Sequence, residues 1–410
     1  MAGITGQGDT FDLPNFVGEL FAVTPEDTPF LSAIGGLTGG EAADATLFQW
    51  QGYDLRDAQD NRQRTEGADA PTAEARVRFN VNNVVEVHQE SLEISYTKMA
   101  ATGQFNSTGS THAGAVGLQG SNPVMRELDW QITQALKQVA RDVHKSFITG
   151  TFNNPANNST ARRTRGIMAA TETNVSTQGG TAKGTATIES DTEVWTLTAH
   201  GLSVGDQIAV TTITGGGVGV LAENQLYYVK TAPDANTFTV SATKGGATLA
   251  FATDGGAVVY EVTPLTEDLV LDLVQQVWEN GGLMESETAT VLCNATLKRA
   301  MTDLFITRKN YQELSRNLAG VSVTTIETDF GRLNLMLDRH MPTAAIQLVS
   351  LEECVPVFLP VPGKGFLFVE ELAKTGAAEK RQMYGEIGLK YGNERKHGKI
   401  LRVGTPAPAA

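Results

Sequence analysis

Histidine, cysteine and paired acidic residues are the side chains of this sequence whose chemistry could support catalysis. The histidines are scattered singly, and none has a Ser, Cys or Asp partner at a spacing typical of a nucleophilic site. The acidic doublets Glu352-Glu353 and Glu370-Glu371 would point to opposite sides of an extended strand, which favours solvated charge. Because hydrolase, zinc-protease, phosphate-loop and calcium-loop motifs are also missing, the sequence predicts no enzyme, no cofactor and no metal site.

The two cysteines and a glycine-rich run also lack the sequence context of a metal, redox or nucleotide site. Cys293 and Cys354 lie in separate apolar stretches without metal-ligand spacing, which predicts buried thiols in a reducing compartment. The glycine run Gly215–Gly219 does not stand between a strand and a helix, as a dinucleotide site requires, and is typical of a hairpin loop.

Composition indicates a globular protein with many strands and loops. The 410 residues include 41% hydrophobic and 19% charged residues with 42 glycines, and they allow two or three domains. The net charge of −14 argues against a general nucleic-acid binder. We expect a soluble chain without a secretion signal, since no basic amino end precedes an apolar run and no stretch is long enough to span a membrane.

The clearest element is a long helix from Asn122 to Thr151. Its apolar residues recur at steps of three or four, and the opposite face is polar. Asn122 can cap the amino end, Pro123 suits the first turn, and Gly150 stands where a helix commonly ends. A rod of this length needs a partner surface. The stripe predicted to face the core comprises Leu128, Ile132, Leu136, Val139, Val143 and Phe147.

Alternating apolar residues predict strands on both sides of this helix. Ala45–Tyr53 and Ala75–Tyr96 flank a charged segment and predict a long hairpin whose tip must rest on another surface. Between Asn174 and Val262, short alternating runs predict six or seven strands of a small sandwich or barrel. Because both flanks of this piece are typical of one α/β layer, we interpret it as a domain inserted into a loop.

Three charged groups are candidates for contacts with neighbouring molecules. The hairpin tip is suited to salt bridges on a neighbour. An arginine loop after the long helix fits either a clamp for an anion or partner carboxylate, or a solvated cluster. A basic tail without interleaved aromatic residues favours subunit contacts over nucleic acid. In chain order, the candidates are Arg56, Arg62, Arg64, Glu66, Arg162, Arg163, Arg165, Arg395 and Lys396.

The order of these elements resembles the HK97-type major capsid proteins of tailed bacteriophages. In that family an N-terminal arm, an extended E-loop, a spine helix, a peripheral domain and an axial domain follow one another. The branch typified by phage SU10 is similar in the motifs TPFLSAIGG, RELDWQITQALKQVARDVHKSFITG, ARRTRGI, ELAKTG and YGEIGLKYGNERKHGKI. The resemblance covers the chain outside residues 174–262, where HGLSVGDQIAV resembles small β-modules of phage structural proteins.

The resemblance implies an α+β, HK97-type capsid fold with an inserted small all-β domain. The expected parts are the N-terminal arm (1–44), the E-loop hairpin with the first peripheral strands (45–98), a linker (99–121), the spine helix of the peripheral domain (122–152), the axial domain (153–173 and 263–345), the inserted domain (174–262), and the returning axial and peripheral strands with the tail (346–410).

The resemblance also implies assembly rather than catalysis. Copies would form hexamers and pentamers of an icosahedral shell that encloses double-stranded DNA without sequence specificity, in a virion assembled in the host cytoplasm. A separate scaffolding protein and a portal are expected partners, a decoration protein or host surface is a candidate partner of the insert, and no membrane is expected. Some relatives crosslink through an E-loop lysine, but the first lysine here is Lys98, so we expect no such bond.

Two other functions fit part of the sequence. An encapsulin-like nanocompartment shell protein would have the same fold, and gene neighbours would separate it from a phage protein. A glycan-binding or carbohydrate-active protein would be expected to show a carboxylate pair, which the sequence does not display.

Overall fold

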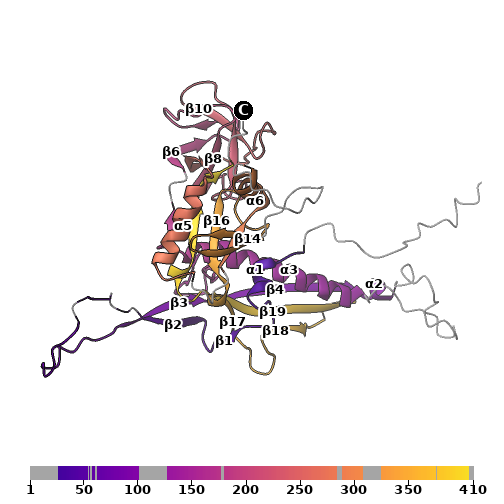
Figure 1. Ribbon diagram of the computed structural model, residues 1–410. Helices are drawn as coiled ribbons and strands as arrows, with labels where there is room; N and C mark the ends of the chain where they lie inside the picture. Colours follow the sequence, from indigo (N-terminus) through magenta and orange to yellow (C-terminus); the bar gives the residue numbers. More distant parts are fainter. Residues whose placement is uncertain are drawn as a thin grey trace, which may run out of the picture. The chain divides into compact units, whose positions relative to one another are not determined.

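A computed structural model describes most of the chain (Figure 1). The expected arm up to residue 25, linker residues 101–121 and Arg56 lie outside the described residues. Contacts divide the chain into a first unit from 87–142 and 361–385 and a second from 28–86, 143–360 and 386–405, as far as these are described. The described residues are 26–53, 55, 58–60, 62–100, 127–176, 180–283, 289–307, 325–374 and 376–405.

The second unit is centred on a six-stranded mixed sheet. Strands β13 (Ala289–Cys293) and β16 (Ala345–Ser350) are buried at every position, which makes them the middle of the sheet. β13 runs parallel to β15 (Gly331–Leu337) and antiparallel to β16. In spatial order the strands are β14 (Thr325–Thr328), β15, β13, β16, β20 (Gly398–Leu401) and β5 (Val175–Ser176).

Two capped helices contribute to the core of this sheet. Helix α5 (Glu267–Glu279) begins after Thr266, whose side chain accepts a hydrogen bond from the backbone N–H of Leu269. Helix α6 (Ala295–Thr302) begins in the same way after Asn294 and continues as a π-helical turn over Asp303–Thr307. Both place an apolar stripe in one core with β13, β15 and β16. The short helix α4 (Ile167–Ala170) precedes β5.

Six strands of the second unit close into a barrel. Each strand coincides with one of the short alternating runs between Asn174 and Val262, and Trp195 and Phe238 are completely buried inside. The run Gly215–Gly219 lies at the end of β8 and in the turn after it, without a following helix. The strands are β6 (Thr181–Ile188), β7 (Trp195–Thr196), β8 (Gln207–Gly215), β9 (Leu226–Thr231), β10 (Thr237–Ser241) and β11 (Gly255–Glu261).

The barrel is tied to the rest of its unit by more than its two chain connections. The Thr343 hydroxyl donates to Gln225 at 2.6 Å, and Gln207 donates to the Thr405 hydroxyl at 2.6 Å. Strands β12 (Thr263–Pro264) and β21 (Val403–Gly404) pair in parallel beside this contact. These hydrogen bonds join the barrel to the segments around Thr343 and Thr405.

A hairpin of strands β2 (Leu47–Tyr53) and β3 (Arg78–Val84) completes the second unit, together with part of a five-stranded sheet. The hairpin is antiparallel, and its register pairs Leu47 with Val84 and Tyr53 with Arg78. In the sheet, β17 (Val355–Phe358) lies between β1 (Glu41–Ala42) and the end of β19 (Ala378–Lys390). The long strand predicted over Ala75–Tyr96 is divided at Val85.

The first unit contains β4 (Glu86–Ser95) from Val87 onward, helix α2 (Tyr96–Ala100), β18 (Leu367–Glu371), the beginning of β19 and the beginning of α3 (Glu127–Thr149). Strand β19 pairs antiparallel with β18 over Arg381–Gly385 and also pairs with β4. Leu92 of β4 and Gln131 of α3 line the same shallow cleft, so the helix covers this sheet.

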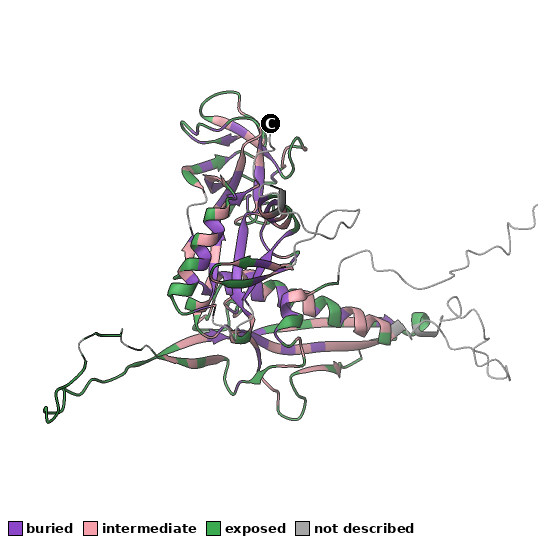
Figure 2. Ribbon diagram, viewed as in Figure 1, coloured by how far each residue is buried: buried purple, intermediate pink, exposed green. Residues whose placement is uncertain are grey.

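The buried face of α3 differs from the predicted stripe in one important position. Val139, Val143 and Phe147 are buried, but Leu136 is 40% exposed, so its assignment to the core was wrong. Ala135 is buried instead, four residues before Val139. Each residue turns the helix by about 100°, and a small alanine can therefore occupy the tightest contact while the larger neighbour turns outward. Leu128 and Ile132 are half-buried, and Figure 2 shows the helix exposed along one side.

We expect Phe147→Ala to lower the free energy of unfolding of the unassembled subunit by about 3–5 kcal/mol, because it leaves a cavity at a fully buried site. The matched control Leu136→Ala should cost about 1 kcal/mol or less, since its side chain is partly in water. Urea unfolding followed by tryptophan fluorescence measures both. An equal decrease in the free energy of unfolding of the two variants would contradict this assignment of the helix faces.

Candidate functional site

The hairpin β2–β3 exposes large apolar side chains that a folded chain would normally bury. Tyr53 is 71% exposed, Leu55 66%, Val77 75% and Phe79 50%. The Phe79 ring lies over Gly52 of the opposite strand, where a Cβ atom would collide with it. Two strands alone are only marginally stable in water, and apolar clusters of this kind mark binding surfaces.

The charged tip of the hairpin contains ion pairs within the chain as well as exposed charged side chains. Arg62 pairs with Glu74, and Arg76 lies 3.5 Å from the same carboxylate. Arg64 and Glu66, both predicted contact residues, are exposed. Exposed ion pairs contribute only about 0–1 kcal/mol, so these charges are available for rearrangement against another molecule.

The arginine loop after α3 is used largely within the chain. Arg162 forms an ion pair with Glu386 at 2.8 Å, and the Arg165 guanidinium lies 3.6 Å from Glu172. Arg163 pairs through its backbone with Asn153 and has an exposed side chain. The three arginines had been predicted to form either a clamp for an anion or partner carboxylate or a solvated cluster, and only Arg163 has an exposed side chain.

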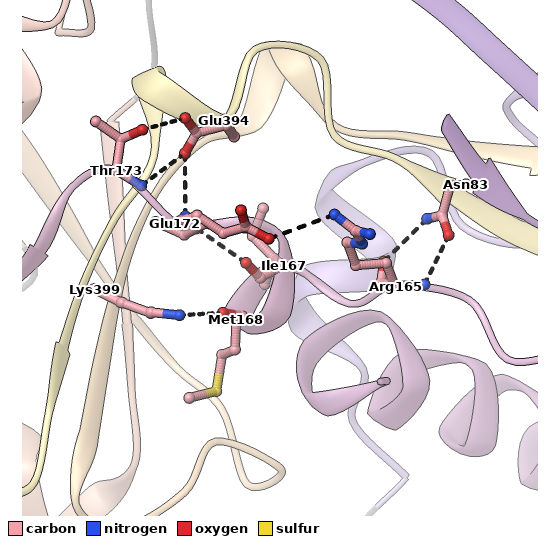
Figure 3. A network of polar contacts seen from close by, with 9 residues as sticks. Asn83, Arg165, Ile167, Met168, Glu172, Thr173, Glu394 and Lys399 are labelled. Carbon is pink, nitrogen blue, oxygen red and sulfur yellow. Dashed lines mark hydrogen bonds and ion pairs between the residues drawn. The ribbon is translucent and has the colours of Figure 1, made fainter. Parts of the chain in front are cut away.

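A polar network fixes the segment that follows this loop (Figure 3). Glu394 accepts hydrogen bonds from the backbone N–H groups of Glu172 and Thr173, both at 3.1 Å. Lys399 donates to the carbonyl oxygen of Met168 at 2.8 Å. Burial lowers the pKa of Lys399, and the nearby carboxylates of Glu172 and Glu394 partly oppose this shift. The network holds an irregular segment against the C-terminal strands.

The predicted contact residues of the tail lie beside this network. Arg395 is exposed, whereas Lys396 donates to Glu353 at 2.6 Å. Lys396 therefore stabilises the turn before β20, and its availability to another subunit is reduced.

A buried histidine that the sequence did not single out joins three distant segments. The backbone N–H of Leu31 donates to Nδ1 of His144 at 3.3 Å, and Nε2 of His144 lies 2.7 Å from a carboxylate oxygen of Asp338. Because Nδ1 accepts, the proton of a neutral ring lies on Nε2, the nitrogen nearer to Asp338. Both side chains have no exposed area, so this pair fixes helix α1 (Pro29–Ala33) without access to a substrate.

The cysteines and possible metal ligands of the described residues were the remaining candidates for chemistry. Both cysteines are free and buried. Burial raises the pKa of Cys293 to about 12, and burial together with Glu353 and Glu352 raises the pKa of Cys354 still further. Among the described residues, no three His, Cys, Asp or Glu side chains are arranged to hold a metal ion, and no helix has the length and apolarity to cross a membrane.

Comparison with known proteins decides the identity of this fold. The model of the family described as SU10 major capsid protein matches residues 3–404. The chain belongs to this family. It is a phage major capsid protein and a structural component of the virion, as the motifs in its sequence had indicated. This match favours a phage capsid over both the encapsulin-like shell and the carbohydrate-active alternative.

Individual relatives are distant. The major capsid protein of Escherichia phage Phieco32 is 26% identical over 136 residues, which are 33% of this chain and 32% of that protein. The capsid of cyanophage A-1(L) is similar with a TM-score of 0.52 and 10% identity over 98% of this chain and 99% of that one. The capsid of an empty GTA particle is similar with a TM-score of 0.50 and 12% identity, again over 98% of this chain and 99% of that one. These structures establish the HK97-type fold of this capsid protein.

The buried cysteines of this capsid protein yield a direct chemical test. At pH 8 we expect neither thiol of the native subunit to react with a disulfide reagent, because burial keeps the pKa of Cys293 near 12 and raises that of Cys354 as well. In guanidinium chloride both thiols should react. The absorbance of the thiolate that the reagent releases gives the number of reactive thiols in the native and in the denatured protein. Rapid reaction of one thiol in the native protein would contradict its burial.

Proposed function

We propose that this capsid protein assembles through its hairpin into hexamers and pentamers of an icosahedral head around double-stranded DNA. The supporting observation is the hairpin surface of Tyr53, Leu55, Val77 and Phe79, which the subunit leaves exposed. Burying such side chains against a second copy would supply the apolar contact area that association requires. Arg64, Glu66 and Arg163 are further candidates for contacts, since each is exposed.

We further propose an assignment of the parts of the fold. The hairpin is the E-loop, α3 is the spine helix within 122–152, and the six-stranded sheet belongs to the axial domain. The expected axial range of 153–173 and 263–345 is thereby extended, because β16 and β20 pair within this sheet. In our proposal the arm (1–44), the linker (99–121) and the remaining strands of 346–410 keep their expected roles.

The barrel within 174–262 is, in this proposal, an inserted domain on the outside of the shell. Its entry and exit lie close together, since the N–H of Gly180 donates to the Thr263 hydroxyl at 2.9 Å. Such a geometry suits an insertion because the host fold is interrupted at one point. A decoration protein or a host surface is the partner we assign to it.

We also propose the remaining partners that the family resemblance implies. A scaffolding protein and a portal would direct closure of the shell in the host cytoplasm. The net charge of −14 supports enclosure of DNA without specific binding, because the average electrostatic force between subunit and DNA is repulsive.

Replacing Phe79 by serine tests the hairpin surface. We expect Phe79→Ser to fold normally, since the ring is half exposed, and to reduce the yield of particles several-fold by removing apolar contact area. Circular dichroism of the subunit and electron microscopy of co-expressed scaffold, portal and capsid protein measure the two effects. The control Val204→Ser alters a 66% exposed side chain of the barrel and should assemble like the wild type. Normal particle yield from Phe79→Ser would refute this role of the hairpin.

Removing the barrel tests the proposed insertion. A short Gly-Ser linker in place of Gly180–Val262 should leave particle formation intact. Deletion of the longer range Asn174–Val262 should instead prevent folding, because the Asn174 amide donates to the carbonyl oxygens of Arg395 and His397 and β5 would be lost. Electron microscopy and solubility distinguish the outcomes. A folded short-deletion subunit that forms no particles would show that the barrel itself is an assembly contact.

A further inference from the structure

The base of the hairpin is held by one fully buried asparagine. Asn83, near the end of β3, has no exposed area. Its Oδ1 accepts from the backbone N–H groups of Val84 and Arg165 at 2.9 and 2.8 Å. Its Nδ2 donates to the carbonyl oxygens of Arg165 and Leu389 at 3.1 and 2.7 Å. The four hydrogen bonds use both ends of the carboxamide and join β3 to two distant segments; Figure 3 shows the pair with Arg165.

Neighbouring groups continue the contact between the same three segments. Glu86 accepts from the backbone N–H of Thr164 at 3.1 Å, and the Thr164 hydroxyl accepts from the N–H of Leu389 at 3.2 Å. The backbone N–H groups of Thr164 and Leu389 thereby gain side-chain partners.

The other strand of the hairpin has a separate attachment. The indole Nε1 of Trp50 donates to the carbonyl oxygen of Gly392 at 2.8 Å, and its ring meets Tyr391 edge to face at 4.9 Å. Gly388 of β19 lies so close that an added Cβ would be 2.8 Å from both the Val84 carbonyl oxygen and the Phe48 ring. Both strands of the hairpin are therefore fixed at the base, whereas the outer half is exposed.

We propose that Asn83 is a positioning residue for assembly: its carboxamide sets the direction in which the hairpin leaves the subunit. This inference rests on the proposed function of the hairpin. Strand positions are usually filled by β-branched or aromatic residues, and asparagine is disfavoured in strands. A side chain with two donors and two acceptors is required here because β3 must bond to a loop and to the edge of β19 at one point.

Aspartate is the most informative replacement. Asn83→Asp keeps the shape and the two accepted hydrogen bonds, but it places a carboxylate oxygen against the carbonyl oxygens of Arg165 and Leu389. Asn83→Ala removes all four bonds without adding a charge and provides a second variant if the aspartate variant folds poorly. Asn80→Asp is the matched control for hydrogen exchange, since it makes the same chemical change at an exposed position of the same strand.

Hydrogen exchange of the unassembled full-length subunit, read by mass spectrometry, tests the positioning itself. In both Asn83 variants we expect exchange over 47–53, 78–84 and 162–166 to accelerate about tenfold or more, as loss of one or two net hydrogen bonds implies. Exchange over the central strands 289–293 and 345–350 should remain unchanged. Equal acceleration everywhere, or none at the hairpin base, would overturn the proposal.

Particle formation with scaffold and portal, counted by electron microscopy, tests the consequence for assembly. Both Asn83 variants should give several-fold fewer regular particles, and the barrel variant Val204→Ser should match the wild type. A loosened base with a wild-type yield of regular particles would refute the positioning role. Failure of wild type and control alike to form particles would instead count against the proposed function, and the exchange data would still decide whether Asn83 fixes the base.

Discussion

Buried backbone groups must find hydrogen-bond partners, and the segment from Arg162 to Asn174 depends strongly on this constraint. Most of it is neither helix nor strand, so its partners come from elsewhere: Asn83 before it in the chain, and Glu394 and Lys399 after it. The hairpin, this segment and the C-terminal strands consequently stabilise one another. None of the three would keep its conformation if another were absent, because each would leave polar groups buried without partners.

The hairpin combines a fixed base with an exposed outer surface, and this combination suits a subunit that must associate many times in the same way. Association is opposed by the loss of conformational freedom, and a surface that is held in place before contact loses less. The attachments of Asn83 and Trp50 provide such placement at the base. The apolar side chains further out, including Val77 and Phe79, are exposed, and in our proposal they supply contact area rather than internal stability.

Elements with a local signal could be predicted from the sequence. The six barrel runs, helix α5 and strand β16 follow from periodicity and capping residues, which are properties of neighbouring positions. Leu136 was misplaced because periodicity identifies a face of a helix but not which of two adjacent residues lies deepest. The internal partners of Arg162 and the pair of His144 with Asp338 were missed because they join residues far apart in sequence. No local pattern records such contacts, and only the folded topology brings them together.

The pairing of basic residues within the chain bears on how this capsid protein contains its genome. Arg162, Arg165 and Lys396 face glutamates of the same chain, and Lys390 lies 2.8 Å from Glu41. Basic groups that are neutralised internally attract DNA phosphates weakly, and the net charge of −14 adds repulsion. Attraction between single subunits and DNA is then a poor basis for packaging. In the proposal made above, containment depends on the contacts between subunits, and the direction and surface of the hairpin matter more than affinity for the genome.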